Sequence, residues 1–152
     1  MNIHELRRGA DSGSRVDRSV LGLCYLYGVD VQVDYKEAFR LLSMAGTSRA
    51  VANLARMYAE GLGISKDTAK AIRLYKAVGR SEFRAQLELG RIYSRGLGVP
   101  IDPVEAFRWY SDAAAREERD CVDDPINAAF VSSGTFEEVQ EAKAYVANAT
   151  KL

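Results

Sequence analysis

The chain has 152 residues, of which 47% are hydrophobic and 28% are charged, and these values are typical of a folded domain and exclude a disordered chain. Its 21 basic and 21 acidic residues cancel to a net charge of zero, which argues against non-specific binding to nucleic acid or to a membrane because both require a broad positive field. With two cysteines, no apolar signal at the N-terminus and no stretch long enough to span a bilayer, we expect reduced thiols and a cytoplasmic location, or a periplasmic one if a signal peptide has been removed.

The first predicted element is a short partial helix at residues 3–12, which resembles the tail of the second helix of a hairpin. It contains His4, the only histidine in the sequence. A catalytic triad built on histidine or a zinc site is therefore not credible. We expect no enzymatic activity, no metal and no cofactor.

A motif of Tyr-x-x-Gly followed by Asp and then Ala occurs three times after this element. Its positions shift by 33 residues between the first two copies and by 35 between the last two. This period predicts an array of helical hairpins, with repeats at about 14–46, 47–81 and 82–119. The copies are Tyr25, Gly28, Asp34, Ala38; Tyr58, Gly61, Asp67, Ala71; and Tyr93, Gly96, Asp102, Ala106.

Local signals set the ends of both helices in each repeat. The first helix is expected to end at the tyrosine, followed by a glycine suited to a left-handed C-cap. A small residue three positions before the tyrosine (Gly22, Ala55 or Gly90) lets a neighbouring helix approach closely. The second helix is expected to start at the aspartate, with capping boxes at Asp34–Glu37 and Asp102–Glu105, whereas Asp67 lacks the reciprocal acid.

The C-terminal part is acidic and is expected to cap the array at residues 124–149. Residues 117–141 hold eight acids and one base. A short helix is predicted at Pro125–Val131, and a capping box at Thr135–Glu138 opens a helix to about Ala149. The apolar face of that helix is predicted to contain Phe136, Val139, Ala142 and Val146.

The third copy runs from Ala85 through Leu89-Gly90, Tyr93, Gly96, Gly98, Asp102 and Ala106 to Trp109-Tyr110. This pattern resembles the Sel-one-like repeat (SLR) family, a relative of the tetratricopeptide repeat. The resemblance covers about residues 14–116; the first copy departs from it at Asp17 and Leu42. It implies an all-α, right-handed superhelix of about three hairpins with partial capping repeats at both ends, forming a single domain over residues 1–152. It also implies an adaptor, scaffold or regulator that binds proteins and is not an enzyme.

A groove for a partner is expected on the first helices, which line the concave face of arrays of this kind. We predict that it is apolar at its N-terminal end and rich in arginine further on, and that it takes a protein or peptide with acidic and hydrophobic residues. The alternative interpretation is a solvated face on which Arg84–Glu88 and Arg56–Glu60, each four residues apart, pair locally. The predicted binding residues are Leu23, Tyr27, Arg49, Asn53, Arg56, Glu60, Arg84, Glu88, Arg91 and Arg95.

Other functional interpretations remain open at this point. An immunity or inhibitor protein would cover the active site of an effector and present the acidic residues 117–124 to a basic target. Nucleic-acid binding through the arginines is less favoured, and the exposed ends of the array offer a route to homo-oligomers. A second arginine series (Arg40, Arg73, Arg108) is expected on the outer surface. Cys24 is expected in the core, and the acidic surroundings of Cys121 disfavour its thiolate.

Overall fold

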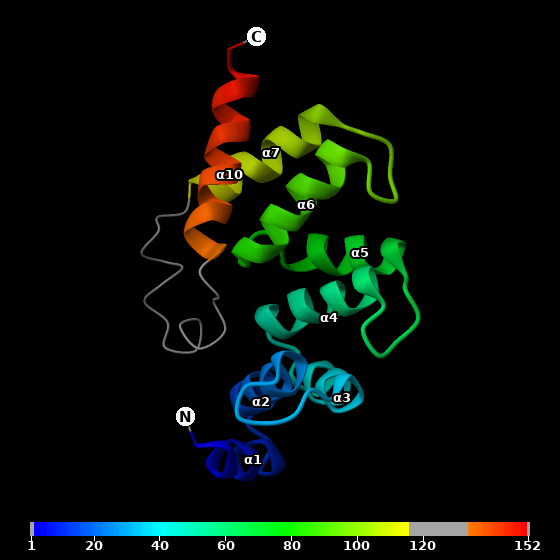
Figure 1. The fold of residues 1–152 in the computed structure, drawn as a ribbon, viewed down its shortest axis with the longest axis vertical. Coiled ribbons are helices and arrows are strands. Elements are labelled where there is room, and N and C mark those ends of the chain that lie inside the picture. Colours follow the sequence, from blue (N-terminus) through cyan, green and yellow to red (C-terminus); the bar gives the residue numbers. More distant parts are fainter. Residues whose placement is uncertain (1, 116–133, 152) are drawn as a thin grey trace. The chain divides into compact units, whose positions relative to one another are not determined.

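The structure is a computed structural model that describes residues 2–115 and 134–151. These residues form eight helices and no strand, which confirms the all-α class (Figure 1). The predicted helix at 125–131, Cys121 and the acidic residues 117–124 lie outside the described residues. The helices are α1 Ile3–Asp11, α2 Arg15–Tyr27, α3 Tyr35–Ala45, α4 Ser48–Glu60, α5 Thr68–Val78, α6 Phe83–Arg95, α7 Pro103–Ala114 and α10 Gly134–Ala149.

The chain divides into two compact units, Met1–Leu74 and Tyr75–Leu152. The helices of a repeat array contact only their neighbours, so a division by contacts falls as easily within one array as between domains. The single domain over residues 1–152 therefore stays a prediction.

In the unit Met1–Leu74, α1 packs on α2, α2 pairs with α3, and α4 packs on both α2 and α3. Ala10 of α1 is buried with Leu21 of α2 and Leu41 of α3, and Ile3 and Leu6 pack against this cluster. The partial helix predicted at residues 3–12 is thus a helix that covers the start of the first hairpin. Its outward side chains, such as His4, Glu5 and Arg8, are exposed.

In the unit Tyr75–Leu152, α6 and α7 form a hairpin and α10 packs mainly on α7 and also on α6. Figure 1 shows α10 lying alongside this hairpin. The cluster beneath α10 comprises Leu87 of α6, Tyr110 and Ala113 of α7, and Ala142 of α10. Val139 is also buried, as the predicted apolar face requires. The side chain of Phe136 lies outside the described residues.

The predicted close approach of helices occurs at Gly22 and Gly90. A Cβ atom on Gly22 would lie 2.8 Å from Cγ of Leu42, and one on Gly90 would lie 2.8 Å from three ring atoms of Tyr110. Real Cβ atoms do not come this close to a neighbour, so a methyl group has no room at either site. Glycine in these helix interiors therefore permits the tight pairing of α2 with α3 and of α6 with α7.

One backbone hydrogen bond closes the loop of every hairpin. The N–H of Asp34 donates to the carbonyl of Tyr25 at 3.0 Å, and the pairs Asp67–Tyr58 and Asp102–Tyr93 repeat this bond at 2.9 Å. The preceding glycines end the first helices in the left-handed conformation, with φ of 72°, 71° and 70°. The nine-residue offset from tyrosine to aspartate is therefore the length of a closed loop.

The capping boxes predicted at Asp34 and Asp102 are wrong in one respect. Each aspartate caps its helix, since Asp34 accepts bonds from two backbone N–H groups and Asp102 does the same. The reciprocal bond from the glutamate is absent because the N–H of each aspartate already donates to the tyrosine carbonyl. Glu37 instead pairs with Arg40 at 2.6 Å.

The second arginine series lies on the surface as expected. Arg40 and Arg108 are exposed, and each pairs with a glutamate three residues earlier, Glu37 and Glu105. Arg73 is also exposed. Lys70 occupies the corresponding earlier position in the middle repeat, so Arg73 has no acid there.

Candidate interaction surface

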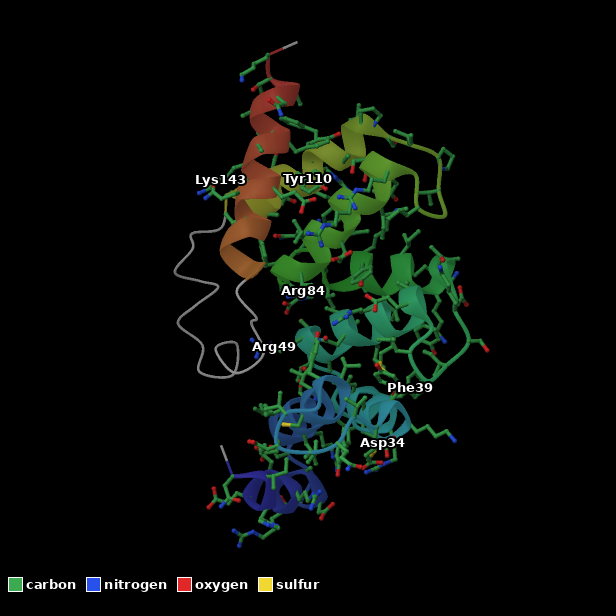
Figure 2. The ribbon with its side chains drawn as sticks, viewed as in Figure 1. Asp34, Phe39, Arg49, Arg84, Tyr110 and Lys143 are labelled. Carbon is green, nitrogen blue, oxygen red and sulfur yellow. The ribbon has the colours of Figure 1, made fainter. Side chains whose placement is uncertain are left out.

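Two polar clusters contain most of the predicted binding residues, one in each unit. The Tyr27 cluster consists of Tyr27 on α2 and of Asn53, Arg56 and Glu60 on α4. The Glu141 cluster consists of Glu88, Arg91 and Arg95 on α6, Tyr110 on α7 and Glu141 on α10. Figure 2 shows side chains from both units and labels Arg49, Arg84 and Tyr110 among them.

The hydroxyl of Tyr27 organises the first cluster. It donates to Oδ1 of Asn53 at 3.0 Å and accepts from Nη1 of Arg56 at 2.9 Å. Asn53 is 5% exposed, and its amide nitrogen donates to the carbonyl of Arg49 at 2.9 Å. The tyrosine hydroxyl is thereby fixed by a buried residue and holds one end of a guanidinium group.

Arg56 is held on three sides. Its Nε donates to Glu60 at 2.8 Å, and its guanidinium carbon lies 5.3 Å from the centre of the Tyr27 ring. Burial acts to lower the pKa of Arg56, but the hydrogen bonds and charge of Glu60 outweigh it and raise that pKa above its ordinary value. The side chains of Arg56 and Glu60 remain 32% and 48% exposed. The cluster therefore presents a fixed pair of a guanidinium and a carboxylate at the surface.

In the second cluster, the carboxylate of Glu141 receives several donors. Nη2 of Arg91 donates to its Oε2 at 2.6 Å, and Nε of Arg91 and the hydroxyl of Tyr110 donate to its Oε1 at 3.3 and 3.2 Å. Arg95 lies 3.5 Å from the same oxygen. Arg91 also donates to Glu88 at 2.8 Å. Glu141 of α10 thus pairs with Arg91 of α6, an arginine that we predicted to bind a partner.

These contacts shift the ionisation of the groups involved. The hydrogen bond from Arg91 lowers the pKa of Glu141, although burial opposes it. The hydrogen bond to Glu141 raises the pKa of Arg91, also against the effect of burial. Burial is the main cause that raises the pKa of Tyr110. At neutral pH, the cluster contains charged Arg91 and Glu141 beside a neutral phenol.

The ten predicted binding residues fall into different environments. Leu23 is 2% exposed, because α2 contacts both α3 and α4 and has little free surface. Arg49, Arg84 and Glu88 are partly exposed, and Arg95 is exposed. Of the two local pairs in the alternative interpretation, Arg56 with Glu60 is confirmed, and Glu88 pairs with Arg91. The assignment of these residues to a partner stays a prediction.

Sequence reasoning did not identify two residues of the Glu141 cluster, Tyr110 and Glu141. The ring of Tyr110 is buried, and its hydroxyl lies 3.2 Å from Glu141. Glu141 lies 50 positions from Arg91. The available signal was a carboxylate beside the apolar stripe of the predicted helix, one position before Ala142.

Neither a membrane-spanning helix nor a metal-binding group is found in the described parts of the chain. No helix there is long and apolar enough to cross a bilayer. No three histidine, cysteine, aspartate or glutamate side chains there are grouped so that they could hold a metal ion. The polar chemistry described above is that of arginine, carboxylate and phenol side chains.

Comparison with known proteins identifies the repeats. The family model for the Sel1 repeat matches residues 20–47, 48–77 and 83–117, close to the three predicted repeats. A Sel1 repeat protein from Oxalobacter formigenes is 32% identical, with a TM-score of 0.62, and the match covers 91% of this chain and 96% of that one. No curated protein matches the sequence.

A longer protein is also similar in fold. It is c5321, a protective antigen of uropathogenic Escherichia coli strains with an SLR fold, at 25% identity and a TM-score of 0.69. The match covers 98% of this chain but 33% of c5321. This chain therefore spans about one third of the length of that antigen.

Proposed function

We propose that this chain, which belongs to the Sel1 repeat family, binds a partner protein through the polar face of its first helices, as an adaptor or regulator. Sel1 repeats generally mediate protein–protein interactions, and the fold is generally non-enzymatic. The proposal adds the chemistry of the contact. The partner supplies acidic side chains, which arginine binds in a forked geometry.

The Tyr27 cluster is the observation that carries the proposal. Arg56 is oriented by Tyr27, which in turn is fixed by the buried Asn53. Its other contact, Glu60, is about half exposed. Exposed ion pairs contribute little to stability, so a partner carboxylate can replace Glu60 on Arg56 at low cost. The arginine meanwhile keeps its position, which reduces the entropy lost on binding.

Arginines that already have carboxylate partners support protein binding over nucleic-acid binding. Arg40, Arg56, Arg91 and Arg108 each pair with a glutamate. These pairs weaken the positive field that non-specific binding to nucleic acid requires. The alternative of an immunity or inhibitor protein depends on residues 117–124, which lie outside the described residues, and no observation favours it.

The test is charge reversal at Arg56 with a matched control. A partner captured from the native host and then purified is titrated against the native chain, Arg56→Glu and Arg73→Glu. Arg73 is an exposed arginine on α5, so its reversal changes the net charge equally outside the Tyr27 cluster. We expect Arg56→Glu to weaken binding at least about tenfold, as loss of a charge-assisted contact should, and Arg73→Glu to change it little.

Equal affinity of the native chain and Arg56→Glu would contradict the proposed contact. Equal weakening by both substitutions would show that net charge alone matters. Binding that falls steeply with salt for a nucleic acid, and for no protein, would replace the proposal with the nucleic-acid alternative.

A further inference from the structure

The surface of α6 and α7 beneath α10 has the properties of a helix-binding site. We call it the α10 seat and define it by Leu87 and Arg91 of α6 and by Tyr110 and Ala113 of α7. Leu87 and Ala113 are fully buried and Tyr110 is 2% exposed. Arg91 is 21% exposed at its side chain. The seat therefore combines an apolar floor with one charged group at its edge.

The helix in this seat shows which chemistry fits it. Val139 and Ala142 are buried, and the ring of Tyr145 lies 4.5 Å from the ring of Tyr110. Glu141 stands between them and takes the hydrogen bonds of Arg91 and Tyr110. In Figure 2, Lys143 lies on the side of α10 away from Tyr110. A matching helix thus has an apolar face with one carboxylate at its border.

From residue 139 onward, α10 is held by two buried residues, by the partly buried Tyr145 and Val146, and by the charged contact of Glu141. Among its described side chains, from residue 139 onward, Val139 and Ala142 are the buried ones. By comparison, α6 has seven buried residues over thirteen positions. An element with little buried apolar area opens at a lower free energy than the core of a domain. Over residues 139–151, the charged contact of Glu141 therefore adds to a small buried apolar area in keeping α10 on its seat.

We propose that the α10 seat is a docking site for an amphipathic helix of the partner, and that α10 is an internal occupant which this helix displaces. The partner helix carries a glutamate or aspartate with apolar residues two positions before it and one, four and five positions after it, which is the spacing of Val139, Ala142, Tyr145 and Val146 around Glu141. This inference rests on the proposed function, because it names the class of partner that such a module takes.

The experiment uses the full chain and a labelled peptide with the sequence of residues 134–151 as the probe. In the native chain, α10 competes with the peptide at an effective concentration on the order of millimolar. Glu141→Arg places a cation against Arg91 and Arg95 and so weakens α10 in its own seat. We expect the peptide, followed by fluorescence anisotropy, to bind Glu141→Arg at least about tenfold more tightly than the native chain, since α10 loses its charge-assisted hydrogen bonds.

Two controls distinguish loss of the Glu141 contact from general destabilisation of the chain. The double variant Arg91→Glu with Glu141→Arg restores opposite charges within the chain, so it should bind the native peptide no better than the native chain does. A peptide that carries Glu141→Arg should not bind the Glu141→Arg chain, because it brings a cation to Arg91. Circular dichroism checks that each variant is folded, and Glu141→Gln, a milder change, gives the same ranking if Glu141→Arg is unstable.

The proposal is overturned if the peptide binds the folded Glu141→Arg or Glu141→Gln chain no better than the native chain. It is also overturned if the double variant binds the peptide as well as Glu141→Arg does, because the charge pairing would then be irrelevant. These outcomes involve no captured partner, so they leave the test at Arg56 unaffected. Loss of the Arg56 effect with intact peptide binding would instead refute the proposed function and keep the seat.

Discussion

Replacing Gly63 with alanine tests how tightly successive repeats pack in the unit Met1–Leu74. Gly63 has φ of 68°, and a Cβ atom there would lie 2.5 Å from Cβ of Tyr35 and 3.3 Å from its backbone carbonyl carbon. The overlap is with atoms that every residue except glycine shares. Truncating Tyr35 to alanine therefore leaves the overlap in place, and Gly63→Ala should not be rescued by Tyr35→Ala.

The expected cost combines two effects. A left-handed conformation costs a residue other than glycine roughly 1–2 kcal/mol, and overpacking adds about 1–3 kcal/mol. The lower entropy of the unfolded alanine chain returns about 0.4–1 kcal/mol. The net loss is about 2–4 kcal/mol, which for a chain of this length lowers Tm by about 5–15 °C.

The assay is thermal and urea unfolding followed by circular dichroism, with Gly98→Ala as the control. Gly98 occupies the same turn position in the third repeat, with φ of 77°, and is exposed. Its replacement should cost about 0.5–1.5 kcal/mol, which is the conformational cost less the gain from the lower entropy of the unfolded alanine chain. If Gly63→Ala costs no more than Gly98→Ala, then contact with Tyr35 does not determine the choice of glycine. If Tyr35→Ala restores the stability of Gly63→Ala, then the overlap is with the tyrosine ring and not with its Cβ atom and backbone.

Three further predictions concern a cap, an ion pair and a thiol. Asp102→Ala should cost about 1 kcal/mol because two N–H groups of α7 lose their acceptor. Asp102→Asn keeps the cap and should cost about a few tenths of a kcal/mol. The midpoints of urea unfolding compare the two variants, and equal losses would refute the capping role. The lowered pKa of Glu141 stabilises the fold above the ordinary glutamate pKa, and this contribution is lost as pH falls through the lowered value. The difference in unfolding free energy between the native chain and Glu141→Gln should therefore shrink from pH 7 to pH 3. A difference independent of pH would exclude the ion pair as its cause. Burial raises the pKa of Cys24 to about 11. In a Cys121→Ser variant, the Cys24 thiol should therefore react with a disulfide reagent slowly at pH 8 and rapidly in urea. Fast labelling of the folded chain would contradict the burial of Cys24.

Local chemistry made much of the hairpin predictable. Gly28 and Asp34 signal a helix end and a helix start through backbone requirements that depend on nearby residues, and the structure places both as expected. The capping box failed for a reason that is also local but not visible in the motif. The N–H that Glu37 would have accepted is already bonded to the carbonyl of Tyr25.

Contacts between distant segments were harder to predict. The helical pattern around Val139 and Ala142 correctly gave the buried face of α10, since burial follows the helix period. The pattern could not show which helix would lie against that face, so the pairing of Glu141 with Arg91 was missed. Leu23 illustrates the same limit, because its 2% exposure depends on how neighbouring helices pack.

The loop-closing bond of the hairpins has a consequence for insertions and deletions. A residue added between Tyr93 and Asp102 would lengthen a segment whose two ends are joined at 2.9 Å. In the joint between α5 and α6, the N–H groups of Ser81 and Glu82 donate locally, to the carbonyl of Val78. Two residues separate α3 from α4 and four separate α5 from α6, and this difference of two accounts for the change in period from 33 to 35. Epitope tags or inserted domains should accordingly be better tolerated between the exposed residues Arg80 and Ser81 than within the loops.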